Sequence, residues 1–253
     1  MVSGARVCAV RRAAIIAAMA GELKPLVHGW VHERRGTVDV WRWKFDEGEW
    51  VAACAGAGVG AATRAFAEVE KSGAPDLVIS FGWAGALTED LRSGRAYWAS
   101  GVIDAQTGER FRPALWSNER WLVTSPRVAD EVEKKRLAAA YGAQMVDMEA
   151  AAIARLAQMR GIPFYILKGI SDGFTDKLPD FNRFIGPDGR FNMAGMALFS
   201  ILRPWHWSSL IRMGENSSKA SQSMREAVLD FLDERAFIRD RNGYPDIKHR
   251  KHD

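Results

Sequence analysis

Two segments indicate the fold most directly: Gln144-Met-Val-Asp-Met-Glu149-Ala-Ala-Ala-Ile-Ala154, and further along Lys168-Gly-Ile-Ser-Asp172-Gly173. A short apolar strand precedes Glu149, and an Ala-rich helical pattern follows it. A second apolar strand, Phe164 to Ile170, leads into Asp172. In an open sheet with helical crossovers, both carboxylates would lie at the carboxyl edge, where such sheets bind ligands. Buried acids are costly without partners, so the pair predicts a functional site.

Apolar runs alternate with helical patterns outward from this stretch. Such alternation predicts an α/β fold, a single domain over residues 1–253 whose central, mostly parallel mixed sheet is flanked by helices. We expect strands at 13–19, 38–45, 50–55, 77–81, 94–100, 121–124, 144–147 and 164–170, and helices from about 20 and at 61–71, 127–141 and 148–160. Residues 1–12 are expected to form a loose leader.

The chain ends in an apolar, aromatic region, which predicts C-terminal helices over 191–235. The last of them is expected at about Ser221 to Arg235, with an apolar stripe. These helices would pack on the sheet or line a subunit interface. The apolar stretch before Arg203 is too short to span a bilayer. The alternative is peripheral membrane contact through 193–213, where arginines and tryptophans are placed as at a membrane interface.

Composition excludes several classes of protein. The 253 residues are 47% hydrophobic and 26% charged, a globular balance, and the net charge is +4. The cluster Lys134-Lys135-Arg136 is expected to be a solvated helix face, and no nucleic-acid-reading motif accompanies it. Cys8 and Cys54 lie in no metal or CxxC spacing. The two cysteines fit a reducing compartment. We therefore expect a cytoplasmic protein without metal or cofactor, with membrane association as the alternative.

Two glycine-rich turns follow strands. Gly56-x-Gly58-x-Gly60 lacks the G-x-G-x-x-G spacing of a dinucleotide site, and its backbone N–H groups at a helix start suit an anion or a water molecule. Gly82 and Gly85 would allow close approach to a ligand.

A third acid, Glu22, follows the first strand. Glu22 and Glu149 could instead be helix N-terminal acids, and Asp172 an ordinary turn residue. Three acids at the ends of separate strands favour the functional interpretation.

At these residues the chain resembles the purine nucleoside phosphorylase/uridine phosphorylase superfamily, nearest its methylthioadenosine/S-adenosylhomocysteine nucleosidase branch. Ala-Ala-Met19-Ala-Gly-Glu22 resembles the opening Gly-Ala-Met-Glu-Glu-Glu of that branch. The segment Pro75 to Leu87 looks like the one that carries Thr-Gly-Ser-Ala-Gly-Gly. Val146-Asp-Met-Glu149-Ala resembles Val-Glu-Met-Glu-Ala, and Ile170-Ser-Asp172 matches Ile-Ser-Asp. The resemblance covers roughly residues 13 to 175, in order.

The resemblance implies cleavage of a purine N-glycosidic bond in a homodimer that binds a small nucleoside. Asp172 would protonate N7 of the purine, and Glu22 would deprotonate the attacking water. Glu149 would accept hydrogen bonds from the ribose hydroxyls, and Met148 would pack under the sugar. Gly85, Trp83 and Ser171 would also contact the substrate.

Phosphate is the co-substrate in the phosphorylases, which place arginines near the glycine loops. Neither 55–62 nor 80–87 contains an arginine, and Arg64 is the nearest, which favours hydrolysis. Phosphorolysis remains the alternative.

Two departures bear on the substrate. Trp83 replaces a small residue beside the sugar, which leaves open a nucleoside-binding protein without catalysis. The short stretch between Gly101 and Val146 and the basic, aromatic tail look more like hopanoid-associated phosphorylase-like proteins, which act on an adenosyl group attached to a lipid. The expected substrate is therefore a 5′-substituted adenosine, with a lipid-linked one as an alternative.

Overall fold

The structure is a computed structural model that describes residues 11–45, 48–113, 119–177, 179–186, 188–192, 195–196, 199 and 207–234. Its strands are β1 (Arg12–Ala17), β2 (Val31–Arg35), β3 (Val38–Phe45), β4 (Gly48–Cys54), β5 (Leu77–Ala86), β6 (Ala96–Trp98), β7 (Gly101–Asp104), β8 (Arg110–Phe111), β9 (Trp121–Thr124), β10 (Met145–Asp147) and β11 (Phe164–Asp172). The helices are α1 (Ala20–Leu23), α2 (Val59–Glu70), α3 (Glu131–Tyr141), α4 (Ala150–Met159), the 3-10 helix η1 (Phe181–Phe184) and α6 (Trp207–Glu234).

One mixed sheet forms the centre of the molecule, in the order β2-β3-β4-β1-β5-β10-β9-β7-β8. The strand β11 pairs with the other edge of β5 and also with β6. Strands β4, β1, β5 and β11 are parallel, whereas β2, β3, β6 and β8 each pair antiparallel with a neighbour. The predicted α/β class, with a mixed sheet and flanking helices, is confirmed.

The strand β5 has two different neighbours along one edge. β1 runs parallel to its first half, up to the pair Ile16–Ser80. β10 runs antiparallel to its second half, through the pairs Met145–Ala86 and Val146–Gly85. The carboxyl ends of β1 and β10 therefore approach each other over the middle of β5. Between these two ends, part of this edge of β5 has no strand partner, which leaves an opening in the sheet. Acids just beyond the carboxyl ends of β1 and β10 face each other across this opening.

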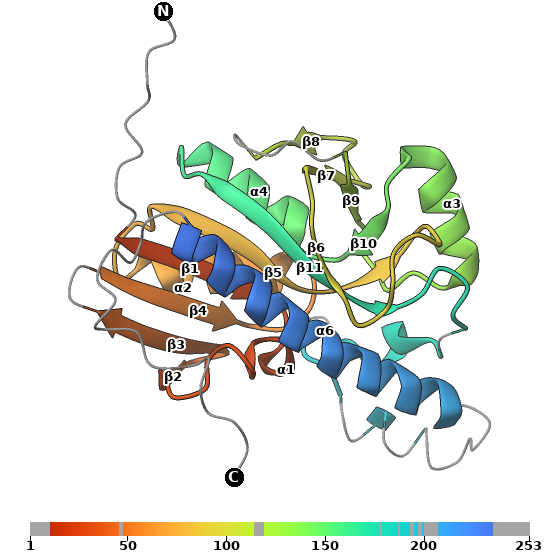
Figure 1. Cartoon of the computed structure of the whole chain (residues 1–253), viewed down its shortest axis with the longest axis horizontal. Helices are drawn as coiled ribbons and strands as arrows, with labels where there is room; N and C mark the ends of the chain where they lie inside the picture. The colour runs from red at the N-terminus through yellow and green to blue at the C-terminus, as the bar shows by residue number, and fades with distance from the viewer. Residues whose placement is uncertain are drawn as a thin grey trace, which may run out of the picture.

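Helices cover both faces of the sheet (Figure 1). On one face, α2 and α4 bury Phe66, Val69 and Ile153 against one set of alternating strand residues. On the other face, the long helix α6 crosses the sheet and buries Met224 and Phe231 against the other set. Strands covered on both faces need continuous apolar sequence, which is why β1, β5 and β11 could be recognised as apolar runs.

The predicted elements differ from the observed ones at several ends. β2, β7 and β8 were not expected, and β5 continues beyond the predicted Phe81 to Ala86. α3 begins at Glu131 because Asp130 caps it, its side chain accepting the Glu133 N–H at 2.8 Å. Arg12 already belongs to β1, so the expected leader is too long at that end, and residues 1–10 lie outside the described part.

The C-terminal prediction was half right. The last helix begins at Trp207 rather than Ser221, and its second half carries the expected apolar stripe. Most of 193–206 lies outside the described residues. In the part of the chain that the structure describes, no helix is long and apolar enough to span a membrane.

Candidate active site

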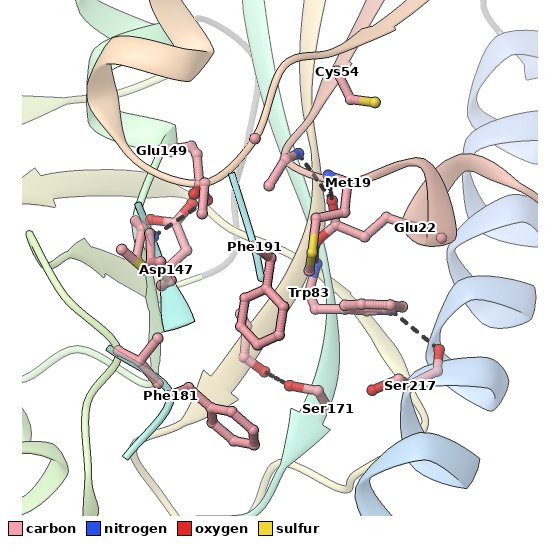
Figure 2. A pocket seen from close by; sticks show the side chains of 18 of the residues that line it. Met19, Glu22, Cys54, Trp83, Asp147, Glu149, Ser171, Phe181, Phe191 and Ser217 are labelled. Atoms are coloured by element: carbon pink, nitrogen blue, oxygen red, sulfur yellow. Dashed lines mark hydrogen bonds between the residues drawn. The ribbon is translucent and has the colours of Figure 1, made fainter. Parts of the chain in front are cut away.

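A cavity of about 1140 Å³ opens where β1 and β10 approach each other. Most of its walls come from residues at or near the carboxyl ends of β1, β4, β5, β10 and β11, from the serine-rich middle of α6, and from the segment after Asp172. In Figure 2, Glu149 and Asp147 lie on one side of the cavity and Glu22 and Trp83 on the other. All the predicted site residues except Gly58 line this one cavity: Glu22, Gly56, Trp83, Gly85, Met148, Glu149, Ser171 and Asp172. Gly58 does not line it but donates to Glu149.

Glu22 lies at the end of α1, with its carboxylate turned back onto the backbone. Oε2 accepts the N–H groups of Ala18 at 2.9 Å and Met19 at 2.8 Å, and Oε1 accepts the Trp83 N–H at 2.7 Å. The Trp83 N–H belongs to the part of β5 that β1 and β10 leave open. Burial raises the pKa of Glu22, although these three hydrogen bonds act in the opposite direction. A carboxylate accepts about four hydrogen bonds, so one acceptor direction is left for a water molecule.

Glu149 faces the same opening from the end of β10. Its Oε1 accepts the Gly58 N–H at 2.7 Å. Burial, and after it the charge of Asp147, raises the pKa of Glu149 to about 8. We expected Glu149 at the carboxyl edge of parallel strands, but β10 runs antiparallel to β5. The acid reaches the site because β10 enters the opening from the other end.

A buried lysine lies under Glu149. Lys168 comes from the middle of β11, is 1% exposed, and lies 2.8 Å from Asp147 Oδ2 through its Nζ. Burial alone would lower the pKa of Lys168, but the charges of Asp147 and Glu149 outweigh it and raise the pKa. Lys168 therefore compensates part of the negative charge that gathers at this site.

Asp172 ends β11 beside a register shift. Ile170 pairs with Ala84 and Asp172 with Gly85, so Ser171 is the extra residue of a bulge. Ser171 Oγ donates to Asp172 Oδ1 at 2.6 Å. The other carboxylate oxygen, Oδ2, is in contact with the ammonium group of Lys134, which also donates to Gly173 O at 2.6 Å.

Three successive backbone N–H groups of the glycine loop after β4 have protein acceptors. Gly56 donates to Ala18 O at 2.9 Å, Ala57 to Gly189 O at 2.8 Å, and Gly58 to Glu149. A Cβ on Gly189 would lie 2.2 Å from Ala57 O, so the turn at Gly189 fits against the loop only as glycine.

Arg64, the nearest arginine in sequence, donates to the carbonyls of Ala55 at 3.3 Å and Asp188 at 2.5 Å. It thereby holds the turn at Gly189 against the loop. Both of these Arg64 contacts go to backbone carbonyls, through Nη2.

Trp83, a residue of β5, packs against α6 in the cavity wall. Its indole N–H lies 3.1 Å from Ser217 O and 2.9 Å from Ser221 Oγ. The side chain is thus held against the helix beside Glu22, as Figure 2 shows. Two phenylalanines that the sequence did not single out, Phe181 and Phe191, also line the cavity, with ring centroids 6.3 Å apart. They offer apolar faces for a planar group.

The two buried lysines are the main omission of the sequence analysis. Lys134 was expected on a solvated face, and this is wrong, because Lys134 is 1% exposed whereas the side chains of Lys135 and Arg136 are 56% and 57% exposed. The signal was its spacing of three from the buried Leu137, which puts both on one face of α3. Lys168 was visible as a charge in an apolar strand, where only a buried partner makes it tolerable.

The arrangement combines acids that differ in surroundings. One carboxylate with a free acceptor direction, a second with raised pKa, and a third in contact with an ammonium group surround an apolar space. Such a set can accept a proton at one end, hold hydroxyl groups in the middle and donate a proton at the other. Among the described residues, no three His, Cys, Asp or Glu side chains are grouped as metal ligands.

A comparison with family models gives one match: the model described as the phosphorylase superfamily matches residues 12–131 and 121–201. Together these ranges cover more than half of the chain. No curated protein sequence matches it.

Solved structures match the chain over most of its length. The 5′-methylthioadenosine/S-adenosylhomocysteine nucleosidase from Neisseria meningitidis in complex with methylthio-immucillin-A has a TM-score of 0.67 at 17% identity, covering 89% of this chain and 100% of that one. The futalosine hydrolase of Helicobacter pylori has a TM-score of 0.66 at 16% identity, covering 89% and 98%. The Arabidopsis thaliana 5′-methylthioadenosine nucleosidase has 0.65 at 14%, covering 90% and 96%. At these identities the likeness establishes a shared fold.

Proposed function

The chain belongs to the phosphorylase superfamily, and from this premise we propose that it hydrolyses the N-glycosidic bond of a 5′-substituted adenosine and releases adenine. The observation that carries the proposal is the convergence of Glu22, Glu149 and Asp172 on one cavity from three separate segments of the chain. Cleavage of this bond develops positive charge on the ribose and negative charge on the base. Acids on both sides of the bond serve both needs.

Each acid has a role that its contacts support. Asp172 protonates N7 of the departing purine, with Ser171 orienting its carboxylate. Glu149 accepts hydrogen bonds from the ribose hydroxyls, and Met148 packs under the sugar. Glu22 uses its remaining acceptor direction to orient a water molecule and take its proton. The rings of Phe181 and Phe191 provide a stacking surface for the base.

Water rather than phosphate is the proposed nucleophile. The N–H groups of Gly56, Ala57 and Gly58 all have protein acceptors, and the turn at Gly189 lies over the loop that would otherwise cradle an anion. Phosphorolysis is the second candidate, favoured by Arg127 and Arg190, which line the cavity and could hold a phosphate.

The 5′ substituent is proposed to be larger than a methylthio group. The cavity of about 1140 Å³ exceeds the roughly 300–1,000 Å³ typical of small-molecule sites. Its α6 wall leads toward Trp207 and Ile211, which are 49% and 62% exposed. A lipid-linked adenosyl group would fit both features, and its apolar part would extend past these side chains.

The test is adenine release from adenosine, 5′-methylthioadenosine, S-adenosylhomocysteine and a lipid-linked adenosine. Each substrate is assayed with phosphate and with sulfate at equal ionic strength. Adenine release at the same rate with and without phosphate, together with formation of the free 5′-substituted ribose, supports hydrolysis. Release that requires phosphate and yields a ribose 1-phosphate would establish phosphorolysis instead. Binding without release from any substrate would make the chain a nucleoside-binding protein.

A further inference from the structure

Lys134 is a buried cation whose partner is the proposed general acid. It comes from α3, whose neighbouring Lys135 extends into solvent and pairs with Glu131 at 2.7 Å. Lys134 instead points inward, is 1% exposed, and contacts Asp172 Oδ2 and the Gly173 carbonyl. An ammonium group in the interior loses much of its hydration energy, and two acceptors restore only part of it.

The surrounding fold is shaped to hold this contact. A Cβ on Gly85 would lie 3.0 Å from Asp172 Oδ2 and 3.1 Å from Lys134 Cε, so the absence of a side chain there makes room for the pair. The bulge at Ser171 sets Asp172 opposite Gly85. Lys134 and Asp172 both line the cavity, so a substrate can reach the pair.

Resting on the proposed hydrolysis, we propose that Lys134 supplies the proton that Asp172 passes to the leaving base. As the C1′–N9 bond breaks, its electron pair goes to the purine, N7 takes a proton from Asp172, and Asp172 takes one from Lys134. The water oxygen bonds to C1′, and the water proton goes to Glu22. Lys134 ends as a neutral amine and Glu22 as a carboxylic acid, so atoms and charge balance. Exchange with solvent after product release restores both groups.

A lysine suits this role and an arginine does not. A buried lysine can lose its proton, whereas a guanidinium stays protonated in proteins. Replacement of Lys134 by arginine therefore keeps the positive charge beside Asp172 but removes the transferable proton. Lys134 does not touch the substrate in this scheme, and it acts through Asp172 alone.

The experiment compares two leaving groups in Lys134→Arg, Lys134→Met and the matched control Lys135→Met. One substrate is the cleaved adenine nucleoside, and the other is the p-nitrophenyl riboside with the same 5′ substituent, whose leaving group needs no proton. We expect adenine release to fall at least about 100-fold in both Lys134 variants, as in Asp172→Asn, and p-nitrophenol release to stay within a few-fold. Lys135→Met should match the wild type on both substrates.

Three outcomes would overturn the inference. If Lys134→Arg released adenine at nearly the wild-type rate, the charge alone would suffice. If both substrates slowed equally in both variants, Lys134 would have a structural role. The single variants leave an unpaired or displaced charge, so the double variant Lys134→Met/Asp172→Asn, which leaves none, serves as a second test if they fold poorly. Its p-nitrophenol release must stay within a few-fold of the wild-type rate. If the wild type cleaved neither riboside, the proposed function would fail first, and this inference with it.

Discussion

The pair Lys168–Asp147 and the pair Lys134–Asp172 use the same chemistry in different surroundings. Both lysines are 1% exposed, and both aspartates end a strand. Asp147 is enclosed by donors: besides Lys168 it accepts the Thr124 hydroxyl at 2.7 Å and the Ala150 N–H at 2.9 Å. Asp172 has one donor on each oxygen, Lys134 on Oδ2 and Ser171 on Oδ1. Both aspartates line the cavity, but the Asp172 side chain is 9% exposed and the Asp147 side chain is 0% exposed.

The difference lies in what each pair leaves available. Asp147 joins β9, β10 and the start of α4, because Thr124 also accepts the Ala151 N–H at 2.9 Å. Such a saturated pair fixes the direction of the chain into Glu149. The Lys134–Asp172 pair has spare acceptor capacity toward the cavity. We infer that an ion pair with all its partners serves the fold, and one with an open side serves the chemistry.

The largest expected effect is a difference in reaction rate between the Asp172→Asn and Asp147→Asn variants. Asp172→Asn should lower adenine release about 10²–10⁴-fold, because an amide cannot transfer the proton. It should also lower the free energy of unfolding, because it leaves the buried Lys134 ammonium without its carboxylate. Asp147→Asn should act mainly on unfolding. Rate assays and denaturant titrations of both variants check this. A larger rate loss in Asp147→Asn than in Asp172→Asn would invert the comparison.

A second prediction concerns stability. Lys168→Met leaves Asp147 charged and buried, so the free energy of unfolding should fall by about 3–5 kcal/mol. Adding Asp147→Asn removes the uncompensated charge and should restore most of the loss. Urea unfolding of the two proteins measures the difference. If the double variant were as unstable as the single one, the cost would come from lost packing rather than from the charge.

The pH dependence of the free energy of unfolding tests Glu149, whose pKa the neighbouring Asp147 helps to raise. Glu149 has an ordinary pKa of 4.5 when unfolded and about 8 in the folded chain. Between these values the folded chain binds more protons, so this group makes the free energy of unfolding decrease as pH rises from about 4.5 to about 8. Glu149→Gln should give a flatter profile over that window. An unchanged slope in unfolding measured from pH 4 to 9 would assign the dependence to other groups.

The smallest expected effect concerns the space around the Lys134–Asp172 pair. Gly85→Ala forces Asp172 or Lys134 to move by a few tenths of an ångström. A displacement of this size should cost about tenfold in rate. Gly60→Ala is the matched control, since its Cβ would meet only Arg64 at 3.7 Å. Equal rates in the two variants would show that the Lys134–Asp172 contact tolerates displacement.

Much of the fold was predictable because its central strands carry continuous apolar runs that end in glycine or proline. β11 is such a strand, and the Ala-rich pattern of α4 likewise identified it as a helix. The edge strand β2 escaped because its residues are mostly charged and exposed. The continuity of α6 was missed because the stretch 214–220, between the two expected C-terminal helices, is polar, and the second half of α6 packs on the sheet.

The site was predictable at the level of its acids but not of their partners. Glu22, Glu149 and Asp172 each follow a recognisable strand and lie in one cavity, whereas their assigned roles remain proposals. The partner of Asp172 comes from a helix 38 positions away. A charged cluster on such a helix looks solvated unless the direction of each side chain is known. Likewise, the antiparallel entry of β10 depends on strand pairing, which a local pattern does not encode.

The double occupancy of the β5 edge has a consequence for the order in which the chain folds. β5 pairs with partners from Ala13 to Asp172, so the site depends on contacts between distant parts of the sequence. Such contacts form late, because long loops must close first. We predict that pulse-labelled hydrogen exchange during refolding finds the β11 amides protected after those of β1 and β4, and simultaneous protection would refute this order. A growing polypeptide would then have no pocket until residue 172 and the strand before it have joined the sheet.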